Sequence, residues 1–345
     1  MPPSGSWRRL PLRFRSGLSS PQRCEREGVI EQGLAGIEDL LERRWSAYGY
    51  EVRSGRLGEL EARLQTGDPR LDEDHAAGFF AFEKALAVGD FRRAVAVKGQ
   101  VEGPITLAFY LLDRGRPLVH DVGFLDACAR HVANLALWQI ERLRPAGLPV
   151  LLFIDEPALS LAKAVGVAED QLASVLRHLL TSLRAAGAVA GLHCCAGLPF
   201  PLMLQANPDV LSFDAHAGLE QFCANRGARA FIRDGGQVAF GLVPTWSRLD
   251  GLTAESLFFR WLDAASAAGD LRQLARHSLV TATCGLGLLD HTAARAAFDI
   301  AHGLACLLER VALVPAPPER PVAADQNELT ESARRQRRAP PYRRL

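Results

Sequence analysis

The stretch Ala188-Val-Ala-Gly-Leu-His-Cys-Cys-Ala-Gly197 predicts a short buried strand that ends in His193, Cys194 and Cys195. Side chains alternate between the faces of a strand, so we expect His193 and Cys195 on one face and Cys194 on the other. Imidazole nitrogen and thiolate sulfur are ligands of zinc. Two such donors, about 7 Å apart along the backbone, can meet one ion if further donors arrive from neighbouring strands. The alternative is a histidine packed beside core cysteines.

Composition limits the class of protein. The chain has 345 residues, 48% of them hydrophobic, and a formal net charge of +1. This suits one large α/β domain or two smaller ones and argues against a dedicated nucleic-acid or acidic-membrane binder. The seven cysteines are an odd number without small-domain spacing, so we predict no disulfide framework and a cytoplasmic location. No apolar run reaches the roughly 18 residues of a membrane span.

The two ends differ in composition from the middle. Residues 1–24 contain five arginines and no acidic residue. They lack the apolar run of a secretory signal, so we predict a disordered or atypical basic start, with a transit peptide as the alternative. Residues 313–345 are rich in proline and arginine and are predicted to be a disordered basic tail. The folded domain is expected at 25–312.

Between these ends, apolar strands alternate with amphipathic helices in six strand-then-helix units. This alternation predicts an α/β fold with a parallel sheet covered by helices. It suits a (β/α)8 TIM barrel that is short by two units, and a doubly wound open sheet is the alternative. No G-x-G-x-x-G follows a strand, so a dinucleotide-binding fold has no support. The predicted strands are 94–98, 149–154, 188–193, 210–213, 237–241 and 278–282, with helices at 25–45, 76–89, from 106, 122–144, 169–186, 198–206, 218–234, 254–268 and 292–310.

Unusual polar residues come directly after four of these strands. In a (β/α)8 barrel the carboxyl ends of the strands build the active site. Donors from four strand ends are therefore expected to meet at one mouth. These residues are Asp155, Glu156, His193, Cys195, Asp214 and Cys284.

His193, Cys195 and Cys284 offer one nitrogen and two sulfur donors, and Asp214 can add an oxygen. This set predicts a tetrahedral Zn²⁺ site with one weak, displaceable carboxylate. A thiolate-rich zinc is better suited to holding a substrate thiol as thiolate than to activating water, which favours alkylation of sulfur. The alternative is that the cysteines are core residues and that Asp214 caps a helix.

The triplet Asp155-Glu156-Pro157 is equally compatible with a substrate-binding role and with a helix-capping role. One carboxylate could hold a substrate ammonium group, since charge-assisted hydrogen bonds are strong. The triplet also fits a helix N-cap followed by a first-turn acid, with proline at the first helical position. Gly103-Pro104 before a helix predicts a turn, which could also present N–H groups to an anion.

Six segments of the chain resemble the cobalamin-independent methionine synthase family, over about residues 22–310. The match is to its catalytic C-terminal barrel, and especially to short stand-alone members. The resemblance implies a (β/α)8 barrel in which zinc activates homocysteine for methylation. It implies His193, Cys195 and Cys284 as metal ligands and Asp214 where the long enzymes have a glutamate ligand. It also implies that Asp155 binds the homocysteine amino group. The segments are VKGQVEGPITLA (97–108), IDEPALS (154–160), LHCCAG (192–197), DVLSFDAHAG (209–218), FGLVPT (240–245) and TCGLG (283–287).

The chain departs from the family pattern in three ways. The opening strand with I-G-S-[LF]-P is absent and the basic residues stand in its place, so we predict a barrel whose first strand is missing or replaced. Pro244-Thr245 stands where the long enzymes have a catalytic histidine. The separate N-terminal barrel that helps to bind polyglutamylated folate is absent. His216 would share a face with Asp214 if that strand persists. It could then be a ligand, orient Asp214 or supply a protonatable group; an ordinary loop histidine is the alternative.

The resemblance and the residues together predict a zinc-dependent S-methyltransferase that converts homocysteine to methionine. Its partners would be a small-molecule thiol and a methyl donor, either methyltetrahydrofolate or a methyl-corrinoid protein. A corrinoid-dependent thiol methyltransferase of the same superfamily is an alternative. A truncated, non-catalytic zinc-binding protein is another. Uroporphyrinogen decarboxylase shares the fold but needs no metal, so the donor set argues against it.

Overall fold

The computed structural model describes residues 14–16, 27–44, 49–245, 249–287 and 289–314. Met1–Ala312 form one compact unit, and Leu313–Leu345 form a second. Most of the predicted basic start and nearly all of the predicted tail therefore lie outside the described residues. Within the described residues, no helix is both long enough and apolar enough to cross a membrane.

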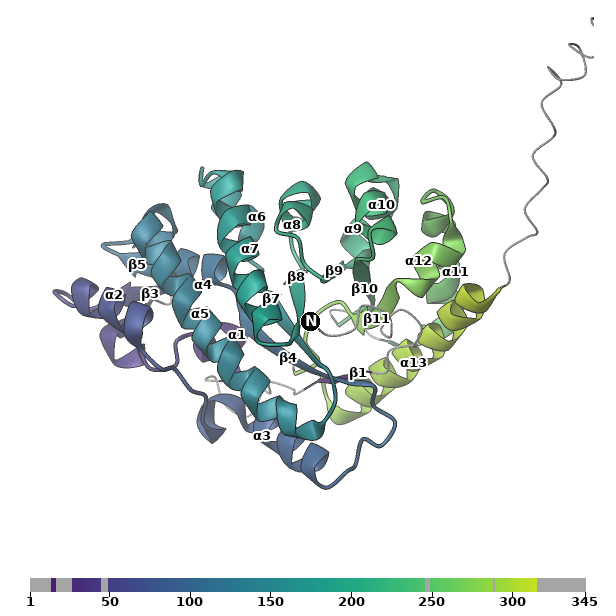
Figure 1. The fold of residues 1–345 in the computed structure, drawn as a ribbon, viewed down its shortest axis with the longest axis horizontal. Helices are drawn as coiled ribbons and strands as arrows, with labels where there is room; N and C mark the ends of the chain where they lie inside the picture. Colours follow the sequence, from purple (N-terminus) through teal and green to yellow (C-terminus); the bar gives the residue numbers. More distant parts are fainter. Residues whose placement is uncertain (1–13, 17–26, 45–48, 246–248, 288, 315–345) are drawn as a thin grey trace, which may run out of the picture. The chain divides into compact units, whose positions relative to one another are not determined.

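Six parallel strands form one curled sheet, with a three-residue strand β1 added beside β4 at one edge (Figure 1). The strands follow one another in sequence order, so the six predicted units are confirmed and a doubly wound sheet is excluded. Among the described strands, the two edges do not pair with each other. The sheet is therefore part of a barrel and not a complete (β/α)8 barrel. The strands are β1 (Phe14–Ser16), β4 (Ala96–Glu102), β7 (Val150–Asp155), β8 (Val189–Cys194), β9 (Val210–Asp214), β10 (Gln237–Val243) and β11 (Ser278–Ala282).

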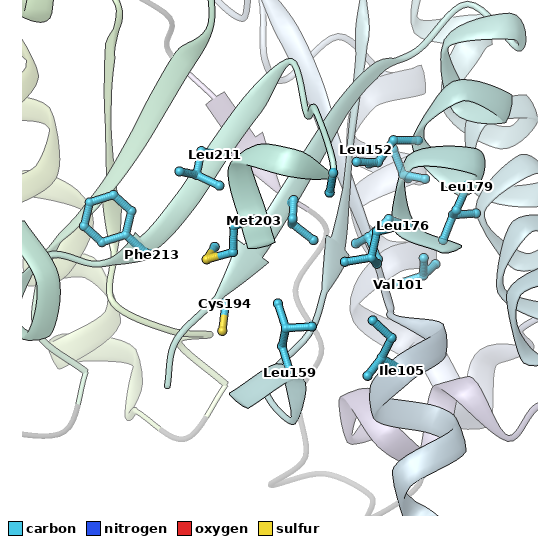
Figure 2. Packing of buried hydrophobic residues seen from close by; sticks show 14 of the residues in the cluster. Val101, Ile105, Leu152, Leu159, Leu176, Leu179, Cys194, Met203, Leu211 and Phe213 are labelled. Atoms are coloured by element: carbon cyan, nitrogen blue, oxygen red, sulfur yellow. The ribbon is translucent and has the colours of Figure 1, made fainter. Parts of the chain in front are cut away.

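Alternate residues of these strands face opposite sides of the sheet, as strand geometry requires. Leu152, Leu211 and Phe213 lie on the side that the helices cover and belong to the main core (Figure 2). The residues between them form a second, smaller apolar cluster on the inner side. Because both sides are buried, the strands read as continuous apolar runs. The inner cluster contains Leu151, Phe153, Val210, Ala239 and Leu279.

The helices present apolar stripes to the outer side of the sheet. In α7 the buried residues recur every three or four positions, which is the spacing of one helical face. The helices of the strand-then-helix part agree with the predicted ranges to within a few residues, apart from the divisions described below. The helices are α1 (Val29–Gly33), α2 (Leu57–Thr66), α3 (Glu73–Ala87), α4 (Pro104–Tyr110), α5 (Val122–Leu143), α6 (Leu159–Ala164), α7 (Glu169–Ala185), α8 (Phe200–Gln205), α9 (Ala215–Ala224), α10 (Arg226–Arg233), α11 (Ala254–Ser266), α12 (Leu271–Arg276) and α13 (His291–Leu313).

Two helix predictions were too long. The predicted helix at 25–45 is only the short α1, since Gly36 adopts a positive φ of 82° and the chain then turns into strand. The predicted helix at 218–234 is divided into α9 and α10. Asn225 lies between them in an extended conformation, and its side chain accepts a hydrogen bond from the backbone N–H of Ala228. It therefore begins a new helix, as N-cap asparagines do.

A second sheet of four short strands was not predicted. Its order is β2-β3-β5-β6. β2 lies within the range predicted as a helix at 25–45, and the other three strands lie where no strand was predicted. Glycine and arginine are frequent there, and the strands span only two to four residues each, so the apolar alternation that marks a strand is too short to detect. The strands are β2 (Leu41–Arg44), β3 (Gly49–Val52), β5 (Leu111–Asp113) and β6 (Arg116–Pro117).

The free side of β4 is covered by a side chain. Beyond Lys98, β1 no longer pairs with β4. At Gln100, the next residue whose backbone groups point to that side, the side-chain amide of Gln139 on α5 forms the hydrogen bonds. Gln139 Oε1 accepts from Gln100 N at 3.1 Å, and Gln139 Nε2 donates to Gln100 O at 2.8 Å. Gly99 makes room for it, since a Cβ at that position would lie 2.6 Å from Gln139 Oε1.

Candidate active site

A row of polar side chains crosses the carboxyl end of the sheet. Glu102 is opposite Asp155, Asp155 is opposite His193, and His193 is opposite Ser212 in the registers of neighbouring strands. Residues in register on neighbouring parallel strands share a face, so the row lies on one side of the sheet. Phe153, two residues before Asp155, belongs to the inner apolar cluster. The polar row therefore lies on the inner side, as predicted for a barrel mouth.

Two cysteines from distant strands meet at this end. Cys195 follows β8 and Cys284 follows β11, with β9 and β10 between those strands. The side chains of Cys195 and Cys284 nevertheless come close enough to interact, and the neighbouring Cys195 thiol lowers the pKa of Cys284 to about 6. The backbone N–H of Gly285 lowers that pKa further. The curl of the sheet thus brings together two predicted ligands and favours a thiolate on one of them.

Cys194 lies on the opposite side from these groups. It is fully buried among the residues that face the helices, near Met203 (Figure 2), and its thiol donates to the carbonyl of Ala196 at 3.1 Å. Burial raises the pKa of the Cys194 thiol to about 12. The predicted alternation of His193, Cys194 and Cys195 between the two faces agrees with this placement.

His193 and Asp214 stand on adjacent strands next to the thiol pair. His193 Nδ1 lies 2.9 Å from Ser212 Oγ, and burial lowers the pKa of the imidazole to about 4, so the ring is neutral at pH 7. Asp214 Oδ1 accepts from the backbone N–H of His216 at 2.8 Å and caps α9. The charge of Asp214 also raises the pKa of Cys284. The carboxylate therefore acts on the thiol site while it caps a helix.

These four donors have the right chemistry for zinc, but they do not converge as a set. No group of three or more histidine, cysteine, aspartate or glutamate side chains in the described part of the chain is placed to hold a metal ion. The two thiols are in contact, whereas the His193 ring is bonded to Ser212 and Asp214 to its own helix. A neutral imidazole and a thiolate are nonetheless the protonation states that zinc requires.

Asp155 ends β7, within electrostatic range of the partly buried Lys98. Burial raises the pKa of Asp155 to about 7, and the charge of Lys98 opposes that shift. Lys98 Nζ donates to Gln100 Oε1 and lies 4.9 Å from the centre of the Phe153 ring. Burial lowers the pKa of Lys98, while the charges of Asp155 and Cys284 raise it. A cation therefore lies within electrostatic range of both the carboxylate and the thiol pair.

Glu156 has a different environment from Asp155. It is fully buried, and its carboxylate accepts from Ile105 N at 3.0 Å, from Thr106 N at 2.8 Å and from Thr106 Oγ1 at 2.6 Å. It thereby caps the start of α4, whose N-cap is Gly103. The N–H groups that the Gly103-Pro104 turn could have presented to an anion are bound by this side chain. Glu156 was predicted as a catalytic candidate or a first-turn acid of its own helix; in the structure it caps the neighbouring helix α4.

His216 lies in the first turn of α9, because the strand ends at Asp214 and does not persist to residue 216. Its Nε2 donates to the carbonyl of Leu242 at 2.7 Å, and its Nδ1 accepts from Arg260 Nη1 at 2.6 Å. Both ring nitrogens thus link the end of β10 to α11. Thr245, whose position was singled out by the resemblance, has its Oγ1 3.0 Å from Thr283 Oγ1.

Sequence reasoning missed two charged residues on the inner face of β4. Lys98 and Glu102 alternate with Gly99 and Val101, which face the helices, and Gln100 lies between them on the same inner side. This alternation of polar and apolar residues is typical of a strand and could have been detected in the sequence. It was overlooked because the strand was predicted to end at residue 98 and not at residue 102.

No protein-family model matches the chain, and no curated protein matches it. Among solved structures, it is similar to a B12-independent methionine synthase from Shewanella sp. W3-18-1 in complex with selenomethionine. The identity is 18% and the TM-score 0.48, over 68% of this chain and 68% of that chain. It is also similar to a methyltransferase from Methanosarcina mazei, with 15% identity and a TM-score of 0.44 over 66% of this chain and 63% of that chain. The chemistry of this chain therefore has to be inferred from its own residues.

Proposed function

We propose that this chain is a methyltransferase that methylates a thiol, with homocysteine as acceptor and methionine as product. The observation that carries the proposal is the contact between Cys195 and Cys284, which come from strands separated by two others in the sheet. Neutral His193 and the Asp214 carboxylate stand on adjacent strand ends. The resemblance of the six segments to the methionine synthase family supports the same reading.

We further propose that Zn²⁺ draws these four residues together when it binds, since in this structure their side chains do not converge on one point. His193 would offer Nε2, which has no hydrogen-bond partner in the described residues, while Nδ1 stays with Ser212. A histidine oriented through its other nitrogen is typical of metal sites. When bound, zinc holds a substrate thiol as a thiolate, which is nucleophilic at neutral pH.

The other residues of the site act on the substrate and its surroundings. Lys98 offsets the negative charges of Asp155 and Cys284, and it lowers the pKa of both groups. Asp155, ionised with that help, would bind the amino group of homocysteine. In the reaction the thiol proton is lost to solvent, and a sulfur–carbon bond forms as the bond between the methyl group and its donor breaks. The donor leaves either as tetrahydrofolate, whose nitrogen takes up a proton from solvent, or as the Co(I) corrinoid, which keeps the electron pair of the broken bond. Methyltetrahydrofolate and a methyl-corrinoid protein are both proposed as donors.

The test combines metal analysis with an assay of thiol methylation. Purified full-length protein is expected to contain about one zinc per chain and to convert homocysteine to methionine with at least one of the two donors. The Cys195→Ser, Cys284→Ser double variant is expected to lose both properties. Cys306→Ser is the matched control, because Cys306 lies on α13 near His302 and away from the strand ends.

The outcomes separate the alternatives. Full zinc retention in the double variant would show that the metal is bound elsewhere. A zinc-loaded wild-type protein that methylates no thiol with either donor would support the non-catalytic zinc-binding alternative. Turnover with the corrinoid donor on another thiol would identify the second enzyme class.

A further inference from the structure

Glu102 is a buried carboxyl group without a partner. It ends β4, it is 1% exposed, and neither Oε1 nor Oε2 has a hydrogen-bond partner in the described residues. Buried polar groups are nearly always hydrogen-bonded, and an exception points to a missing ligand, ion or water. The neighbouring Glu156, buried to the same degree, accepts hydrogen bonds from Ile105 and Thr106. Glu102 therefore stands out among the acids of this region.

The carboxyl group of Glu102 lies next to the proposed site. Glu102 is opposite Asp155 in register, and both share the inner face with Lys98. Gly33 allows the carboxyl group to fit, since a Cβ there would lie 2.4 Å from Glu102 Oε2. Neighbouring strands are about 4.8 Å apart, so the side chains of two residues in register can reach one small ligand together.

The charges around Glu102 are negative. Burial, followed by the carboxylates of Glu156, Glu31 and Asp155, raises the pKa of Glu102 well above 4.5. Lys98 does not offset them, since it donates to Gln100 and its charge acts on Asp155 and Cys284. Glu31 is itself held by the hydroxyl of Tyr50 at 2.6 Å. The group that this position lacks is a cationic hydrogen-bond donor.

We propose that Glu102 and Asp155 together bind the ammonium group of an aminothiol substrate, and that Glu102 makes the site prefer such a thiol over one without the amine. An ammonium group has three donors, which is enough to bond both carboxylates and one further acceptor. The proposal rests on the proposed function, because it places the ammonium group beside a thiol-binding site. It adds a specificity-determining residue that the sequence analysis did not identify.

The test compares two thiols that differ in the amino group. Homocysteine and 4-mercaptobutanoate are titrated by calorimetry into the full-length protein, as wild type and as Glu102→Gln. Wild type is expected to bind homocysteine at least about tenfold more tightly than 4-mercaptobutanoate, the effect of a hydrogen bond between charged groups. Glu102→Gln is expected to weaken homocysteine binding by about tenfold or more and to leave 4-mercaptobutanoate unchanged.

Glu42→Gln is the matched control, since Glu42 is an exposed carboxylate that pairs with Arg53 on the small sheet. It is expected to bind both thiols as wild type does. Glu102→Asp keeps the charge but shortens the side chain by one methylene, and an intermediate preference is expected. Thermal melting shows whether Glu102→Gln folds. If it does not, Glu102→Asp and the comparison of the two thiols on wild type test the proposal in its place.

The results separate the two proposals. If wild type binds both thiols equally, or if folded Glu102→Gln keeps the wild-type preference, the role of Glu102 is overturned while the proposed function stands. If wild type binds neither thiol, the proposed function fails and the proposal for Glu102 fails with it.

Discussion

Replacing Glu156 distinguishes a structural acid from a catalytic one. Its three hydrogen bonds fix the first turn of α4, with Ile105 N on Oε1 and both Thr106 donors on Oε2. A glutamine keeps one acceptor oxygen and turns an NH₂ group toward a backbone N–H. At least one buried donor is then unpaired, which costs about 1–3 kcal/mol. Glu156→Gln is therefore expected to lower the free energy of unfolding by about 2 kcal/mol.

Glu156→Ala removes all three acceptor contacts and leaves a cavity. Gly103 allows the carboxyl group to approach, since a Cβ there would lie 2.1 Å from Glu156 Cδ. The space left behind is therefore lined by backbone that cannot easily move. The loss of the helix cap and the unpaired backbone donors together are expected to lower the free energy of unfolding by about 4 kcal/mol, which is near the upper end for single substitutions.

Urea unfolding followed by circular dichroism measures both effects. The matched control is Glu169→Gln, because Glu169 is an exposed first-turn acid that pairs with Lys163 at 2.7 Å. Its cost is expected to be below about 1 kcal/mol, as for other surface pairs. If Glu156→Gln unfolds at the wild-type urea concentration but has lost thiol methylation, the capping argument is refuted and Glu156 acts on the substrate.

Three further predictions follow from the site. Cys194→Ala is expected to retain zinc while Cys195→Ala loses most of it, by metal analysis; the reverse pattern would place the strand register one residue off. His216→Ala is expected to retain zinc and to lower the free energy of unfolding by about 1–2 kcal/mol, since its ring bonds to Leu242 and Arg260 are lost; an unchanged urea midpoint argues against this role. The pKa of Glu102 is raised well above 4.5 in the folded protein, so the contribution of its proton to stability is complete below pH 4.5 and is lost as the pH rises. The free energy of unfolding of wild type relative to Glu102→Gln should therefore fall from pH 4.5 upward, and a pH-independent difference would contradict this.

The sequence was informative wherever a feature depends on one element. The strand at 188–193 and the opposite facing of Cys194 follow from local apolar pattern and from alternation, and the structure has both. The six units follow from the same alternation of strand and helix. Their sequential order then follows because consecutive parallel units tend to lie side by side.

Features that depend on two distant elements were not predictable in the same way. The partner of Glu156 is a helix start some 50 residues earlier in the chain, and no local pattern relates the two. The contact of Cys195 with Cys284 depends on how strongly the sheet curls, which is a property of all the strands together. The small sheet was missed for a third reason, since its strands gain their stability from one another and not from a long apolar pattern.

The Gln139 side chain has a consequence for association between chains. An open parallel sheet exposes the backbone of its edge strand, and such an edge can pair with a strand of another molecule. At Gln100 both backbone groups on that side are already bonded to the Gln139 amide, which imitates the peptide group of a neighbouring strand. A foreign strand would have to displace both bonds and the α5 helix that supplies them. At Gln100, therefore, the backbone is not available as a template for domain swapping or fibril growth.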